Sequence, residues 1–101
     1  MNIDSLDWDE WNLPHVEKHG YSLADAESIC FGEHVYYTAS YKNRDVILGP
    51  ARDERILAVI LGRVPNETDD VYYVFSLRPA RRKERAYYEQ KKRQSIEESS
   101  D

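Results

Sequence analysis

The centre of the chain, residues 55–77, has the sequence RILAVILGRVPNETDDVYYVFSL. Its first part is an almost unbroken apolar run and its last part is rich in aromatic and β-branched residues, and both compositions favour β-strands. The polar stretch 65–70 between them suits a hairpin loop. We therefore expect 55–63 and 71–77 to pair as the antiparallel centre of a sheet.

Two earlier segments are expected to extend this sheet. A third strand is predicted at 44–48, which reaches residue 56 through a turn over 49–54. Residues 35–41 could form a fourth strand or an extended loop. The sheet is therefore expected to hold three or four antiparallel strands.

A first short helix is predicted near the N-terminus. Residues 12–14 (NLP) open it, since proline is tolerated in the first turn, and Gly20 is placed to end it in the left-handed conformation. Its inward side chains are predicted to be Trp11, Val16 and His15.

A second short helix is predicted to follow. Ser22 can cap its N-terminus, with Asp25 completing a capping box, and Gly32 can end it. The residues of one face are Leu23, Ala26, Ile29 and Cys30. Because both helices are too short to persist alone, they must pack against an apolar surface, which is the sheet.

The positive charge of the chain is concentrated near its C-terminus. Residues 78–93 (RPARRKERAYYEQKKR) hold eight of the fourteen Lys and Arg residues and two Glu, so this segment carries +6 in a chain whose net charge is −5. The remaining 85 residues therefore carry −11. A basic helix is predicted over 80–93. Residues 78, 81 or 82, and 85 share one side at helical spacing, so their guanidinium groups are predicted to form a stripe. Residues 94–101 are predicted to form a frayed polar tail.

Length and composition predict one soluble domain over residues 1–93. A chain of 101 residues has room for a single modest core. Cys30 is the only cysteine, which excludes an internal disulfide and fits a reducing cytoplasm. The acidic N-terminus does not match a signal peptide, and no segment approaches the ~20 apolar residues of a membrane span. We therefore expect a cytoplasmic protein with no membrane contact.

Three groups of motifs, in the same order along the chain, give the sequence a family resemblance. They are WD at 8–9 with KHGYS at 18–22, LG at 48–49 with RILAV at 55–59, and SLRPA at 76–80 with ER at 84–85 and YYE at 87–89. On these residues the chain resembles the BrnT family, the toxin half of a bacterial type II toxin–antitoxin pair. The resemblance covers most of the chain, from residue 8 to residue 89.

The resemblance implies a fold, an activity and a partner. It implies a compact α+β relative of the RelE ribonuclease fold and an endoribonuclease that needs no cofactor. The implied partner is a DNA-binding antitoxin of the BrnA kind, in a dimer or a heterotetramer. His15 and His19 have the spacing of a helical metal pair, but no third ligand accompanies them in a familiar pattern, so we expect no metal site.

RNA cleavage by 2′-hydroxyl attack needs a base, cations that hold the phosphorane charge, and an acid for the departing 5′-oxygen. Arginine suits the second role, because its planar fork binds two phosphate oxygens and stays charged. We expect Arg78, at the junction of the last strand and the basic helix, to take it. The other candidate catalytic residues are Glu84, His19 and Tyr88, and the candidate RNA-binding residues are Lys18, Ser76, Arg81, Arg82, Arg85 and Tyr87.

These residues also have structural alternatives. The cationic stripe could be a solvated helix face, or it could bind an acidic protein such as an antitoxin. Glu84 could pair with basic neighbours, His19 could cap a helix, and one of the two tyrosines could belong to the core. The nuclease hypothesis depends on Arg78 facing a groove rather than being bonded within the fold.

Two whole-chain hypotheses stay open beside the nuclease. The interval from Trp8 to His19 is one residue shorter than the BrnT pattern, and Leu77 and Pro79 depart from its usual residues. These differences favour a catalytically degenerate relative that docks RNA or an antitoxin-like partner through its basic helix. Alternatively, the acidic N-terminal third could cover that helix, within one chain or across a dimer.

Overall fold

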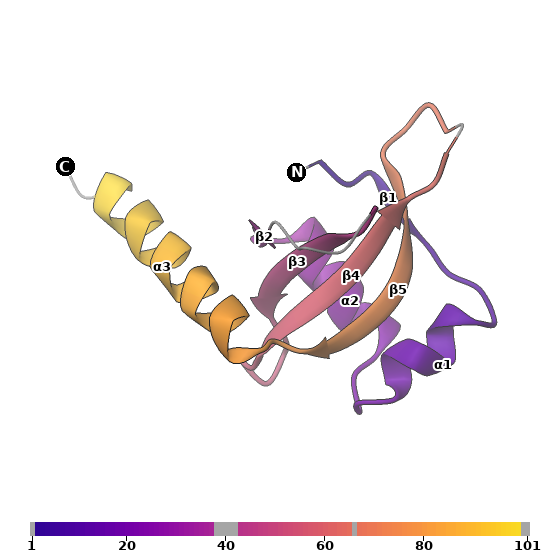
Figure 1. The fold of residues 1–101 in the computed structure, drawn as a ribbon, viewed down its shortest axis with the longest axis horizontal. Helices are drawn as coiled ribbons and strands as arrows, with labels where there is room; N and C mark the ends of the chain where they lie inside the picture. The colour runs from indigo at the N-terminus through magenta and orange to yellow at the C-terminus, as the bar shows by residue number, and fades with distance from the viewer. Residues whose placement is uncertain (1, 38–42, 66, 100–101) are drawn as a thin grey trace.

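One five-stranded sheet organises the protein (Figure 1). The computed structural model describes residues 2–37, 43–65 and 67–99. The strands are β1 (Ser5–Asp7), β2 (Val35–Tyr37), β3 (Asp45–Pro50), β4 (Ile56–Arg63) and β5 (Val71–Pro79), and the helices are α1 (Asn12–Glu17), α2 (Leu23–Phe31) and α3 (Arg82–Ser99). The order in the sheet is β1-β5-β4-β3-β2. The sheet and its helices form an α+β domain, as predicted.

The predicted centre of the sheet is confirmed. β4 pairs antiparallel with β5 on one side and with β3 on the other. Its residues are buried along almost the whole strand, which explains why its sequence is apolar without alternation. The strand predicted at 44–48 corresponds to β3, and β2 occupies part of the range left open as strand or loop. Residues 38–41 of that range lie outside the described residues.

The expectation of three or four antiparallel strands is wrong in number and in direction. β1 is an additional strand that runs parallel to β5, with Leu6 opposite Tyr72. Leu6 is the single apolar residue of this three-residue strand, so no periodic pattern reveals it. Hydrogen bonds hold its start instead: Asp4 N donates to Asp70 O at 2.9 Å, and Asp70 N donates to the Asp4 carboxylate at 2.9 Å.

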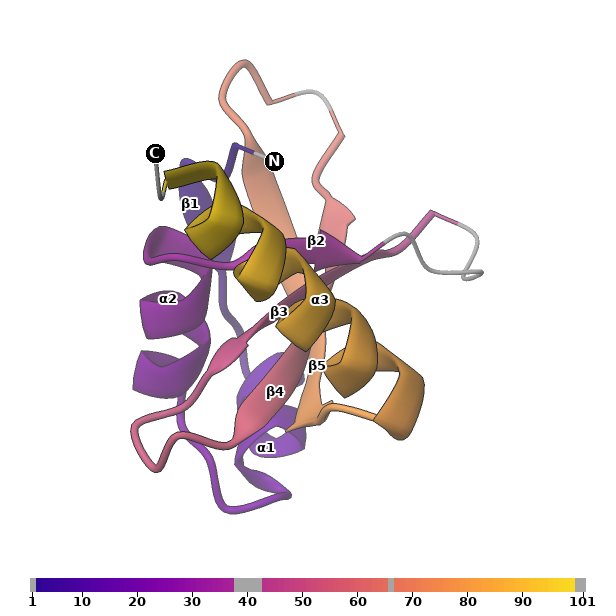
Figure 2. The same ribbon diagram turned by 90° about the vertical axis from the view of Figure 1, so that its left-hand side faces the viewer.

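Different helices cover the two faces of the sheet (Figure 2). α1 and α2 pack on one face, where the buried core includes Val16, Ala26, Ile29, Leu57, Val59, Leu61, Val74 and Leu77. α3 crosses the other face, which we call the α3 face, over a smaller core of Val46, Leu48, Ala58, Ile60, Ala80 and Tyr88. The two helices of the acidic N-terminal third therefore do not cover the basic helix within one chain, although Glu33 lines a pocket together with Lys91 and Lys92 of α3.

Local sequence explains the boundaries of the two short helices. Gly20 follows α1 with φ +83°, the left-handed conformation predicted for it. Ser22 caps α2, and Asp25 completes the predicted capping box because its carboxylate accepts the Ser22 N–H at 3.0 Å. Gly32 follows the last residue of α2. The predicted starts of both helices and the predicted stop of α2 are thus confirmed, whereas α1 already ends at Glu17, three residues before Gly20.

The predicted inward side of α1 is only partly correct. Val16 is fully buried, but His15 is exposed and the Trp11 side chain is 74% exposed. Asn12 lies inward in their place and is 1% exposed. The prediction that Trp11 faces inward is therefore wrong.

Asn12 is buried because it satisfies backbone groups where the chain turns from β1 into α1. Its Oδ1 accepts the Asp9 N–H at 2.8 Å, and its Nδ2 donates to Asp7 O at 2.8 Å. These groups would otherwise lack partners in a partly buried position, which costs free energy. A polar side chain therefore joins the edge strand to the first helix.

α3 is longer than predicted. It ends at Ser99 rather than at residue 93, so residues 94–99, where a frayed tail was expected, are helical. Figure 1 shows the C-terminal end of this helix well away from the strands. In the described ranges, no helix has the length and apolar character needed to cross a membrane.

Replacing Asn12 by Ala should destabilise the protein by about 1–3 kcal/mol, because the Asp9 N–H and the Asp7 carbonyl both lose a partner. The measurement is the free energy of unfolding in urea. Trp11→Ala is the matched control, since it removes a larger but exposed side chain from the adjacent position and should change stability by less than about 0.5 kcal/mol. Equal losses in the two variants would contradict the role given to Asn12.

Candidate nucleic-acid interface

Arg78 lies near the end of β5, where the strand leads into α3. It is opposite Ala58, so its side chain is on the α3 face. Nη1 donates to Glu84 Oε1 at 2.7 Å and Nη2 donates to Glu84 Oε2 at 3.0 Å, which makes a two-pronged ion pair. The two side chains are 15% and 6% exposed. Arg78 is therefore bonded within the fold, which counts against a guanidinium held ready for a phosphate.

Glu84 also stabilises the start of the basic helix. Its Oε1 accepts the Arg81 N–H at 2.7 Å, and that N–H is one of the donors that the first turn of a helix leaves unpaired. Burial raises the pKa of this carboxyl, but the Arg78 guanidinium and the Arg81 N–H outweigh burial and hold the pKa below its ordinary value. The group is thus ionised at neutral pH and is a poor general base. The contacts of Glu84 therefore match its predicted structural alternative, in which it pairs with a basic residue instead of acting in catalysis.

Three arginines at the N-terminal end of α3 face solvent. The exposed residues are Arg81, Arg82 and Arg85. The first of them adjoins the Arg78–Glu84 pair, because its N–H donates to the Glu84 carboxylate. Arg81 and Arg85 are four positions apart, so their side chains project from the same side of the helix. We call these three residues the cationic rim. They form the exposed part of the predicted cationic stripe.

The two tyrosines of α3 take part in packing. Tyr88 is 6% exposed and belongs to the core beneath the helix, as expected for one of the two. Tyr87 is half-buried, and its ring meets the Tyr37 ring edge to face with centroids 5.1 Å apart. Lys91 and Lys92 lie over the rings of Tyr87 and Tyr88, at 5.5 and 5.6 Å from the centroids. Tyr87 is therefore the more accessible ring.

Ser76 shares the α3 face with Arg78, as their spacing on a strand predicts. Their partners in β4 are Ile60 and Ala58, which both belong to the core beneath α3. Ser76 is half-buried. It thus lies on the same side of the sheet as the cationic rim.

Lys18 and His19 are on the other side of the sheet. They follow α1, whose buried Val16 belongs to the core on the opposite face. The structure therefore does not bring His19 together with the other three catalytic candidates. Within residues 2–37, 43–65 and 67–99, no group of three or more His, Cys, Asp or Glu side chains is arranged to hold a metal ion.

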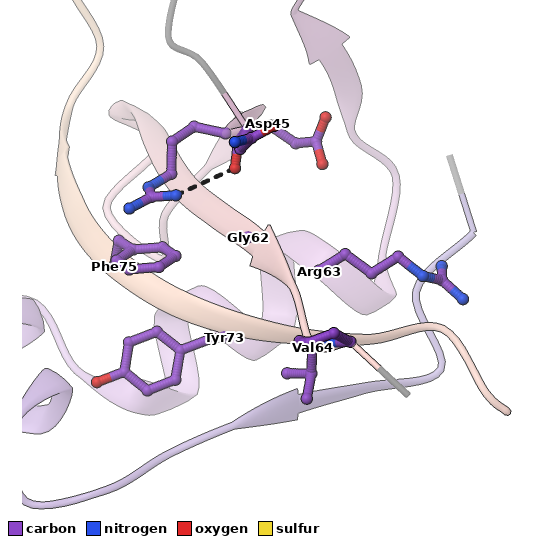
Figure 3. Close-up of a pocket in the computed structure, with 9 residues that line it drawn as sticks. Asp45, Gly62, Arg63, Val64, Tyr73 and Phe75 are labelled. Carbon is purple, nitrogen blue, oxygen red and sulfur yellow. Dashed lines mark hydrogen bonds between the residues drawn. The ribbon is translucent and has the colours of Figure 1, made fainter. Parts of the chain in front are cut away.

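An open groove on the α3 face was not predicted from the sequence (Figure 3). Its volume is about 670 Å³, and its lining residues are Asn43, Arg44, Asp45, Gly62, Arg63, Val64, Pro65, Tyr73 and Phe75. Figure 3 shows the rings of Tyr73 and Phe75 next to each other at this groove, which we call the aromatic groove. Strict strand alternation would put these two rings on the face opposite Ser76 and Arg78, so the sequence pattern does not connect them.

No protein-family model matches this chain, and no curated protein matches it either. The resemblance to BrnT therefore rests on the ordered motifs alone. The activity and the partner that it implies are proposals.

Glu84→Gln should destabilise the protein by about 3 kcal/mol at neutral pH, because it removes the carboxylate that pairs with the largely buried Arg78 charge. The folded-state pKa of Glu84 lies below its ordinary value of 4.5, so its stabilising contribution is present above that value and is lost as pH falls through the folded-state pKa. The difference in unfolding free energy between wild type and variant should therefore shrink as pH falls below 4.5.

The matched control is Glu89→Gln, which removes an exposed carboxylate from the same helix and should change stability by less than about 0.5 kcal/mol. Urea denaturation over a series of pH values measures both variants. Equal stability of the two variants at pH 7 would contradict the role of the Arg78–Glu84 pair.

Proposed function

We propose that this chain is a BrnT-type toxin, a RelE-like endoribonuclease from a bacterial type II toxin–antitoxin pair that acts on RNA in the cytoplasm. The ordered motifs from residue 8 to residue 89 support the family assignment. A sheet with helices on both faces is compatible with it. The cleavage that we propose uses no metal ion and no cofactor.

The placement of the cations is the observation that carries this proposal. Arg81, Arg82 and Arg85 are exposed at the end of α3 that adjoins Arg78, whereas α1 and α2 lie on the opposite face of the sheet. Arginine forks bind phosphate oxygens in pairs, so the cationic rim is suited to the backbone of RNA. Tyr87 and Ser76 lie on the same side and are suited to contacts with bases or sugars.

In the cleavage step, Arg78 stabilises the charge of the phosphorane. Because both of its terminal nitrogens now bind Glu84, the guanidinium must exchange this carboxylate for phosphate oxygens. Glu84 is then a positioning residue rather than the base, since its pKa is lowered in the folded protein. Neither remaining candidate for proton transfer lies exposed beside Arg78, because His19 is on the opposite face of the sheet and Tyr88 is buried beneath α3.

A second candidate function is a catalytically degenerate BrnT-like protein that binds RNA or an antitoxin without cleaving RNA. Three observations favour it: Arg78 is bonded to Glu84, Tyr88 is buried in the core, and His19 is on the far face. The cationic rim serves this function equally well. Its protein partner would be a BrnA-like, DNA-binding antitoxin whose acidic side chains face the rim, in a dimer or heterotetramer.

A double variant, Arg78→Met with Glu84→Gln, distinguishes the ribonuclease from the degenerate candidate. It removes both charges of a buried ion pair, a change that often leaves a fold intact, and the amide can still accept the Arg81 N–H. If Arg78 stabilises the phosphorane, the folded double variant should cleave RNA about 10²–10³-fold more slowly than wild type. The measurement is single-turnover cleavage of a labelled RNA, with circular dichroism to verify folding.

The control is Arg52→Gln, which removes an exposed arginine bonded to Asp25 of α2 and should cleave at the wild-type rate. A double variant that cleaves at the wild-type rate would remove Arg78 from the mechanism. A wild-type protein that binds RNA and never cleaves it would establish the degenerate candidate.

The salt dependence of RNA binding tests the cationic rim. Log affinity for single-stranded RNA should fall with log salt by about 0.7 for each phosphate neutralised. Arg82→Gln with Arg85→Gln should therefore reduce this slope by about 1.4. The measurement is fluorescence anisotropy between low and physiological salt, and an unchanged slope would show that RNA does not contact the rim.

A further inference from the structure

A bulge in β5 builds the floor of the aromatic groove. The register between β4 and β5 shifts at Ile60 and Leu61, and this leaves Phe75 as the extra residue of β5. A Cβ on Gly62 would lie 2.4 Å from Phe75 Cε2, so the ring occupies space that only a glycine leaves. The sheet thus accommodates an aromatic ring at this position, on the part of the α3 face that the helix does not cover.

Arg44 lies over the Phe75 ring. Its guanidinium carbon is 3.6 Å from the ring centroid, and its Nη1 donates to Asn43 O at 3.1 Å. Tyr73 supports the ring from the side, with centroids 4.9 Å apart and planes at 66°. The Tyr73 hydroxyl in turn donates to Asp9 Oδ1 at 3.1 Å. A planar cation is therefore held in place before any ligand binds.

The charge of Arg44 is not neutralised by a carboxylate among the described residues. The neighbouring Asp45 carboxylate accepts a hydrogen bond from the Tyr36 hydroxyl at 2.8 Å. Arg63, which also lines the groove, forms an ion pair with Asp70. The groove thus holds a half-buried guanidinium over an aromatic ring. Nucleobases stack on such guanidinium and aromatic planes.

β5 connects the aromatic groove to Arg78 and the cationic rim. Because of the bulge, Phe75 and Ser76 both lie on the α3 face, and Arg78 follows on the same face. At about 3.4 Å per residue of a strand, Phe75 and Arg78 are roughly 10 Å apart along β5. One short single strand could therefore reach from the rim into the groove.

We propose that an unpaired RNA base stacks on the Arg44 guanidinium in the aromatic groove, with Phe75 behind it. The inference rests on the proposed function, because it assigns a place to a base of the RNA whose phosphates bind the cationic rim. An acidic protein segment is the rival occupant. Such a segment would use the charge of Arg44 but would give no role to the ring behind it, so the geometry favours a base.

Arg44→Lys tests the proposal, because lysine keeps the charge and removes the planar guanidinium. The probe is a single-stranded 2′-O-methyl oligonucleotide, which has no free 2′-hydroxyl and is not cleaved by the proposed mechanism. Stacking of one base is worth roughly 5- to 150-fold in affinity, so we expect a loss of about fivefold or more. The slope of log affinity against log salt should stay unchanged, because the number of phosphate contacts is the same.

A second variant and a second probe support this test. Phe75→Leu removes the ring behind Arg44 and should produce a similar loss of affinity with the same salt slope. Wild-type protein should also bind an abasic oligonucleotide of equal length more weakly, again with the same slope. Arg52→Lys, an exposed arginine near α2, is the matched control and should bind as wild type.

The possible outcomes separate this inference from the proposed function. If Arg44→Lys and Phe75→Leu bind the oligonucleotide as tightly as wild type, base stacking is wrong, the RNA-binding rim stands, and the groove is left to a protein partner. If wild type binds neither probe even at low salt, both the inference and the proposed function are wrong.

Discussion

β4 has to be covered on both faces, and most of the structure follows from this requirement. Its apolar residues lie inward on either side, so the sheet needs a packing layer above and below. α1 and α2 supply one layer over the larger core. α3 supplies the other with few apolar side chains, chiefly Ala80, Tyr87 and Tyr88, so its cover is incomplete. The aromatic groove is the part of the sheet that remains open as a result.

The Arg78–Glu84 pair fixes where the second layer begins. It joins the last strand to the first turn of α3 and so sets the position of the cationic rim. The two hydrogen bonds from Arg78 to the Glu84 carboxylate also occupy the guanidinium. In the proposed ribonuclease, this guanidinium would stabilise the charge of the phosphorane. If the protein is a ribonuclease, stability and catalysis would compete for this one side chain; in the degenerate candidate, Arg78 would serve stability alone.

Much of the fold could be predicted from the sequence because local patterns determine it. The apolar run of β4, the capping box at Ser22 and the left-handed Gly20 each act over a few residues. Features that depend on distant partners could not be predicted. β1 is held by bonds to the segment before β5, and the Arg78–Glu84 pair spans a strand–helix junction rather than a helical spacing.

The candidate site shows the same division. The cationic stripe was visible as composition, but the bulge at Phe75, which unites the aromatic groove with Arg78 on one face, has no sequence pattern of its own.

Residues 78–93 carry +6 and the rest of the chain carries −11, so the charge of the protein is unevenly distributed despite its negative total. If RNA is the ligand, as proposed, its phosphates would be attracted to the basic helix and repelled by the acidic remainder, and the resulting torque would orient the protein before the surfaces touch. Added salt would remove this torque as well as the attraction, and collisions would then occur in random orientations.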